Sequence, residues 1–138
     1  RLRTDPRWYL KASGAFRRMK WHQRVLTRYA LQQQGKTTER YEIHVVRLGP
    51  VAFATNPFEY YLDFGCHIKA RSPAVQTFLV QLAGGGTYVP SSRSVAGGGY
   101  GSVPASNHIG PEGGRILALE TVNALQRLWP ETRPKENS

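Results

Sequence analysis

The sequence predicts an α/β fold, with a mixed sheet and flanking helices, because helical and strand-like patterns follow one another along its 138 residues. A basic amphipathic segment comes first, β-branched runs bounded by Gly and Pro come next, and a second helical pattern lies near the end. Hydrophobic residues form 40% of the chain and aromatic residues 11%, which is enough for a folded core. We therefore expect one globular domain or part of one.

The first predicted elements are a helix over residues 14–34 and two strands over residues 41–47 and 51–54. The helix carries apolar side chains at nearly helical spacing, with Arg and Lys on its other face: Phe16, Met19, Leu26 and Tyr29. The first strand alternates and is β-branched, whereas the second is continuously apolar and is expected to be more buried. The Gly49-Pro50 pair between them predicts a tight turn.

A second helix is predicted from Asn56 to Arg71, followed by a third strand over residues 77–82. Asn56 suits the N-cap, and Pro57 suits the first helical position. Glu59 suits the third position, where it closes a capping box with Asn56.

Glycine and serine dominate residues 84–110, so little regular structure or core is expected there, although loops of this length are often functional. A last helix begins at residues 110–112 and ends at Pro130. Its apolar stripe consists of Ala118, Val122, Leu125 and Trp129. The end of the chain, residues 130–138, is expected to form a tail.

The formal charge of +10 is concentrated near the start of the chain, since residues 1–47 carry +9 and residues 48–138 carry +1. The predicted organisation is a basic amphipathic helical segment over residues 1–40, an α/β part over residues 41–129, and the tail. Basic clusters with interspersed aromatic residues suit phosphates or an anionic lipid surface, but solvated helix faces have the same composition. Nucleic acid is the less favoured partner. No apolar run is long enough for a membrane-spanning helix.

No local catalytic signature identifies an activity. The sequence lacks a P-loop, a His-Glu-x-x-His motif, a Gly-x-Ser-x-Gly motif and any cysteine pair with metal-binding spacing. The four histidines are scattered, and a lone histidine is more often a surface residue than a ligand. The single cysteine, Cys66, is expected to be a small buried residue.

Two regions nevertheless suggest a site near the ends of predicted strands. Glu59 follows a buried strand and could project into the crevice where α/β folds bind ligands, although a helix cap is the simpler interpretation. Tyr88 and Tyr100 lie in the glycine-rich connection, where a tyrosine is usually a packing residue. Spacing alone leaves both the structural and the functional roles open.

Two longer segments carry a resemblance to a known family. Residues 47–59, Arg-Leu-Gly-Pro-Val-Ala-Phe-Ala-Thr-Asn-Pro-Phe-Glu, resemble a strand-to-helix segment of the neutral/alkaline, non-lysosomal ceramidases, with Phe58 where these enzymes commonly have glycine. Residues 81–91 contain Gly-Gly-Gly-Thr-Tyr-Val-Pro and are similar to the family's loop of asparagine, a small residue and Tyr-Val-Thr-Thr. Tyr100 follows Tyr88 at the spacing of the family's second active-site tyrosine.

The Gly-Pro-Glu-Gly-Gly entry to the last helix also fits the end of the family's catalytic region. The resemblance therefore covers about residues 40–129 and indicates a divergent branch of the family. It implies that Glu59 and Tyr88 are Zn²⁺ ligands and that Tyr100 is catalytic, close to the scissile amide. The chain would be part of a larger catalytic domain in a zinc-dependent amide hydrolase that cleaves a lipid-like N-acyl amide.

Zinc needs about three protein ligands, so the resemblance further implies a partner for this chain. Histidines and a serine that takes part in cleavage would come from a missing N-terminal segment of the same enzyme, and the chain alone would be inactive. A secreted or periplasmic location would follow. Two alternatives stay open: a non-catalytic basic module that binds nucleic acid or an anionic lipid surface through residues 7–28, and an inactive relative in which Glu59 is only a cap.

Overall fold

The computed structural model describes residues 7–36 and 38–129. Its main sheet has the strand order β1-β2-β4, formed by β1 (Val45–Leu48), β2 (Val51–Thr55) and β4 (Gln76–Val80). β1 and β2 are antiparallel, whereas β2 and β4 are parallel, so the sheet is mixed. The ends of all three strands lie within four residues of their predicted positions.

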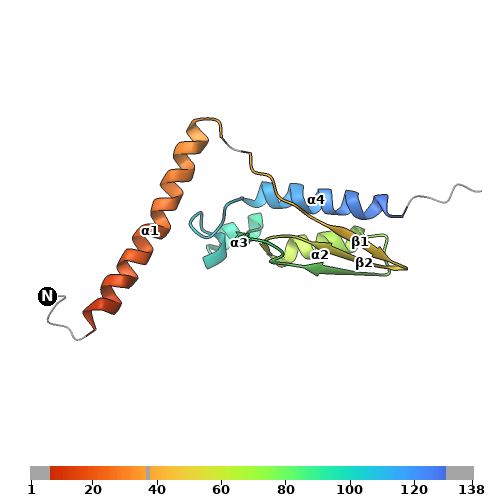
Figure 1. Cartoon of the computed structure of the whole chain (residues 1–138), viewed down its shortest axis with the longest axis horizontal. Helices are drawn as coiled ribbons and strands as arrows, with labels where there is room; N and C mark the ends of the chain where they lie inside the picture. The colour runs from red at the N-terminus through yellow and green to blue at the C-terminus, as the bar shows by residue number, and fades with distance from the viewer. Residues whose placement is uncertain (1–6, 37, 130–138) are drawn as a thin grey trace, which may run out of the picture.

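Two helices cover one face of this sheet, which confirms the predicted α/β fold with a mixed sheet and flanking helices. α2 (Leu62–Arg71) and α4 (Pro111–Arg127) pack against each other and contact the strands (Figure 1). Alternation along β2 places Ala52 and Ala54 beneath them. The largest fully buried side chains of this core are Phe58, Ile68, Leu125, Val89 and Pro90.

The opposite face of the sheet is apolar and exposed. Val46 pairs with Phe53 in one register and Phe53 pairs with Phe78 in the other, so the three side chains form one row across the strands. The Phe53 and Phe78 rings stack with centroids 5.1 Å apart. Leu48 and Val80 extend the patch along the outer strands, and all five residues are classed as exposed. Contiguous apolar patches of this kind usually mark interaction surfaces.

α1 (Trp8–Gln33) is a long helix that projects from the rest of the molecule (Figure 1) and buries none of its side chains. It begins earlier than predicted, because Gly14 has open space around it and is accommodated inside the exposed helix. Its end agrees with the prediction, and Gly35 follows with a φ of 73°, which favours glycine. Residues 1–6 and 37 of the predicted basic segment, and the predicted tail, lie outside the described residues.

The segment at Asn56 is extended, so the predicted helix start there is wrong. The Phe58 N–H donates a hydrogen bond to Asn56 Oδ1 at 2.8 Å, which makes the asparagine the cap of a turn. β3 (Glu59–Tyr60) then pairs in parallel with β5 (Tyr88–Val89), and α2 begins only after it. Glu59 is therefore not a helix cap, because pairing with a distant segment overrides the local helix signals.

The glycine-rich segment contributes more structure and core than predicted. Besides β5 it contains α3 (Ser92–Gly97) and a short 3₁₀ helix, η2 (Tyr100–Ser102), and Val89 is fully buried. Glycine is required at position 86, because a Cβ there would lie 2.1 Å from the carbonyl oxygen of Pro57. The Gly86 N–H donates a hydrogen bond to that oxygen at 2.9 Å. The glycine therefore permits the close approach that joins β3 to β5.

Cys66 on α2 is exposed, which corrects the expectation that it is buried. The core-facing residues of α2 are Phe64 and Ile68 instead.

Candidate functional site

Glu59 of β3 and Tyr88 of β5 are direct partners in the parallel register. Adjacent strands lie about 4.8 Å apart and paired positions share a face, so the two side chains emerge next to each other. Their successors, Tyr60 and Val89, point into the core with exposed fractions of 9% and 0%. The short strand pair therefore presents one carboxylate and one phenol together on a partly exposed face.

The Glu59 carboxylate raises the pKa of Tyr88 above its ordinary value. The largest cause is the negative charge of Glu59, which disfavours a second negative charge on the phenolate. Burial, a hydrogen bond between the two side chains and the neighbouring tyrosines act in the same direction. At neutral pH the Tyr88 hydroxyl therefore keeps its proton and donates a hydrogen bond to the Glu59 carboxylate. A bound cation would act in the opposite sense, because positive charge favours the phenolate.

Tyr100 lies beside this pair. Its ring centroid is 5.8 Å from that of Tyr88, and the two planes meet edge to face at 83°. Tyr100 is the first residue of η2 and is 69% exposed, so its hydroxyl is accessible. The structure thus gathers Glu59, Tyr88 and Tyr100 from three separate segments, while their metal-ligating and catalytic roles stay predictions.

Tyr61 and Ser102 belong to the same cluster and were not identified from the sequence. Ser102 Oγ donates a hydrogen bond to Tyr61 Oη at 3.2 Å. Tyr61 follows β3 and lies two positions after Glu59, which places both side chains on one face of an extended segment. Had the segment been interpreted as a strand, its period of two would have revealed Tyr61.

Gly101 shapes the floor of this cluster. A Cβ at this position would lie 2.8 Å from Tyr61 Oη and 2.9 Å from Tyr88 Cγ. Both distances are shorter than real Cβ atoms show, so any larger residue would displace one of the two tyrosines. The glycine after Tyr100 therefore serves the packing of Tyr61 and Tyr88.

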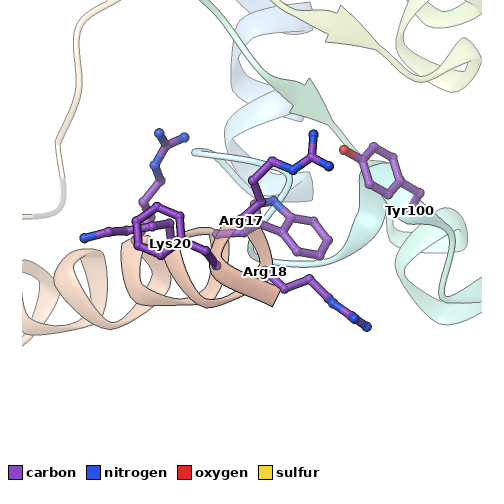
Figure 2. Close-up of a pocket in the computed structure, with 7 residues that line it drawn as sticks. Arg17, Arg18, Lys20 and Tyr100 are labelled. Atoms are coloured by element: carbon purple, nitrogen blue, oxygen red, sulfur yellow. The ribbon is translucent and has the colours of Figure 1, made fainter. Parts of the chain in front are cut away.

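A pocket of about 450 Å³ lies between α1 and Tyr100 (Figure 2). It is lined by Phe16, Arg17, Arg18, Lys20, Trp21, Arg24 and Tyr100. The Trp21 ring stacks on Tyr100, with centroids 5.7 Å apart and planes inclined by 20°. About two turns further along α1, Arg28 donates a hydrogen bond to the carbonyl oxygen of Pro104. These contacts join α1 to the segment that carries η2.

The cluster offers two oxygen atoms to a cation, from the carboxylate of Glu59 and the phenol of Tyr88. Two oxygens are fewer than the ligand set of a zinc site. The histidines do not complete it: His22 lies on α1, His44 before β1, His67 on α2 and His108 before α4. Across residues 7–36 and 38–129, no three His, Cys, Asp or Glu side chains form a group that could hold a metal.

Comparisons with protein-family models, curated proteins and solved structures found no match to this chain. Among the described helices, none has the length and hydropathy needed to cross a bilayer. The fold and the tyrosine-carboxylate cluster are therefore the observations from which a function is inferred.

Proposed function

We propose that this chain supplies part of the zinc site of an amide hydrolase resembling the neutral ceramidases, which cleaves a lipid-like N-acyl amide. The observation that carries the proposal is the pairing of Glu59 with Tyr88, with Tyr100 against the edge of the pair. These three residues were singled out from the sequence by the resemblance, and they form one cluster in the fold.

Each residue of the cluster has a distinct task under this proposal. Glu59 and Tyr88 each hold the metal through one oxygen, and Tyr88 gives up its proton when it does so. Tyr100, which is exposed beside them, donates a hydrogen bond to the amide carbonyl of the substrate. A bound zinc ion would lower the pKa of its water to about 7 and so supply the attacking hydroxide at neutral pH.

The proposal requires a second portion of the same enzyme, which brings histidine ligands and a serine. The exposed apolar face of the main sheet offers a surface on which such a portion would pack, centred on the stacked Phe53 and Phe78 rings. Burial of apolar area contributes about 25 cal/mol per Å², so a patch across three strands is a substantial driving force for association.

The test is zinc binding by the complete enzyme. Glu59→Gln and Tyr88→Phe should each weaken zinc binding by about tenfold or more, because each removes one ligand charge or oxygen. Glu112→Gln serves as the control, since Glu112 lies on α4 and pairs with Arg115 at 2.6 Å. Unchanged zinc content in both site variants would refute the proposal.

The charge of α1 favours a second candidate function, a basic module that binds an anionic lipid surface. α1 contains no Asp or Glu and carries six cations: Lys11, Arg17, Arg18, Lys20, Arg24 and Arg28. Binding to anionic phospholipid vesicles and to duplex DNA should be titrated at rising salt, because phosphate-dominated binding weakens steeply. Salt-dependent binding to vesicles but not to DNA would support the lipid surface. Binding to neither would indicate that the basic residues of α1 only face solvent.

A further inference from the structure

We propose that the pocket between α1 and Tyr100 binds the negatively charged group of an acidic N-acyl amide, meaning an amide whose amine part carries a carboxylate or phosphate. This inference rests on the proposed amide hydrolase function and specifies its substrate class. The pocket is lined by residues of α1 and by Tyr100, the residue expected beside the scissile amide.

The first support is the charge of the pocket. Arg17, Arg18, Lys20 and Arg24 contribute four cationic side chains. Within the part of the chain that the structure describes, none of these four forms a salt bridge. A guanidinium group offers a planar fork of N–H donors that matches the oxygens of a carboxylate or phosphate. The pocket therefore combines a strong positive charge with donors that are not committed to a carboxylate.

The second support is the apolar wall. Phe16, Trp21 and Tyr100 complete the lining, and Lys20 lies over the Phe16 ring with its Nζ atom 5.7 Å from the centroid. Phe16 and Tyr100 are exposed, so the rings offer apolar surface to the carbon atoms next to the charged group of a ligand. In Figure 2, Arg18 and Lys20 point in different directions, Arg18 below the helix and Lys20 to the side away from Tyr100.

The third support is continuity with the candidate metal site. Trp21 stacks on Tyr100 at 5.7 Å between centroids, and Tyr100 meets Tyr88 at 5.8 Å. Tyr88 in turn shares a hydrogen bond with Glu59. A substrate whose amide lies at the Tyr100 hydroxyl can therefore place a short substituent in the pocket. Its volume of about 450 Å³ is large enough to admit such a group.

Three of the pocket residues lie in one row along the helix. Arg17, Trp21 and Arg24 follow the i, i+4, i+7 spacing that places side chains in a row, and Arg28 extends the row to its contact with Pro104. The side of α1 that carries the pocket is thus the side through which the helix contacts the rest of the molecule. The Arg28 contact and the Trp21 stack on Tyr100 are the contacts that hold this row of α1 against the segment that carries η2.

Binding of two short, water-soluble amides to the full chain tests this inference without zinc. N-hexanoylglycine carries a carboxylate, whereas N-hexanoylethanolamine has the same amide and no charge. Isothermal titration should show that the charged amide binds at least about tenfold more tightly. Its advantage should disappear in Arg17→Gln/Arg24→Gln. Glutamine keeps a good helix propensity, and circular dichroism checks that α1 is intact.

The matched control is Lys69→Gln/Arg127→Gln, which removes two positive charges from α2 and α4, outside the pocket. It should bind the charged amide as the unchanged chain does. Equal binding of the two amides, or equal weakening in the pocket and control variants, would overturn the inference. Inorganic phosphate that displaces N-hexanoylglycine and binds as tightly as it does would also overturn the inference, because the pocket would then be a site for free anions.

A membrane surface is the competing ligand, and phosphatidylglycerol vesicles provide that arm of the test. If Arg17→Gln/Arg24→Gln weakens only vesicle binding, the basic face of α1 serves a membrane and the inference is wrong. The outcome is separable from that of the zinc proposal. Binding of N-hexanoylglycine is measured without zinc and tests Arg17 and Arg24, whereas the zinc proposal is tested at Glu59 and Tyr88, so either result can fail without the other.

Discussion

Glu59 and Tyr88 lie opposite each other in the two-residue parallel pairing of β3 with β5, and the carboxylate raises the pKa of the phenol. Glu59 follows the buried strand β2, whereas Tyr88 belongs to the distant glycine-rich segment. Pairing of β3 with β5 brings their two side-chain oxygens together. The charge and the proton of this pair are the properties that experiments can follow.

The pKa of Tyr88 should fall toward its ordinary value in Glu59→Gln, because the amide removes the negative charge that opposes ionisation. Ultraviolet titration of tyrosinate measures this, with the Tyr88→Phe curve subtracted to isolate one phenol. In Glu112→Gln the midpoint should not move. A Tyr88 midpoint that is the same with and without the Glu59 charge would contradict the pairing.

Gly101→Ala should disturb the cluster without changing any polar group. The new Cβ would lie within 3 Å of both Tyr61 and Tyr88, so we expect a loss of about 1–3 kcal/mol in the free energy of unfolding and a shifted Tyr88 titration. Gly85→Ala is the matched control, because a Cβ there meets nothing within 4 Å. Urea unfolding of both variants gives the comparison. Equal stability of the two would show that Gly101 has more space than described.

The chain should lose stability at alkaline pH because Tyr60 is buried. Burial raises the pKa of Tyr60 to about 12, so the folded chain retains a proton that the unfolded chain releases near pH 10. The contribution of the neutral phenol is complete below about pH 10 and is lost as the pH rises toward 12. Urea unfolding across this range should show the decline, and Tyr60→Phe should reduce it.

The same substitution should be neutral or stabilising at pH 7. The Tyr60 hydroxyl is buried and has no hydrogen-bond partner among the described residues, so its removal relieves a desolvation penalty of about 1 kcal/mol. A destabilisation of more than about 1.5 kcal/mol would mean that the hydroxyl has a partner.

The exposed sheet face should behave as an interaction surface. Phe53→Thr/Phe78→Thr keeps residues of good strand propensity but removes the stacked rings at the centre of the patch. We expect weaker fluorescence of a bound hydrophobic dye and less self-association in sedimentation experiments. Val75→Thr is the control, since Val75 is 85% exposed and lies outside the strands. Similar dye binding by the control and the double variant would argue against this surface.

Local patterns predicted much of the fold. The antiparallel turn at Gly49-Pro50 and the last helix after Gly110 carry strong signals within a few residues, and both are confirmed. β3 was missed because Asn56 and Pro57 resemble a helix start, and only pairing with β5 fixes the extended conformation. Such long-range pairing is absent from any local window of sequence.

The candidate site divides in the same way. The resemblance selected Glu59, Tyr88 and Tyr100, which the structure brings together. Spacing could not reveal that Trp21 stacks on Tyr100, because that contact depends on how α1 is placed against η2. The aromatic and basic residues around Trp21 suit either an anionic partner or a solvated helix face, and nothing local connected them to Tyr100.

Zinc ligation by Glu59 and Tyr88 can be followed through the tyrosinate absorbance of the complete enzyme as zinc is added at neutral pH. When zinc is bound by both residues, the Tyr88 hydroxyl must lose its proton. Added zinc should therefore produce a tyrosinate band, with one zinc ion bound per enzyme. The band should vanish in Tyr88→Phe and require much more zinc in Glu59→Gln. A band of equal size and zinc dependence in the unchanged enzyme, Tyr88→Phe and Glu59→Gln would show that these two residues do not ligate zinc.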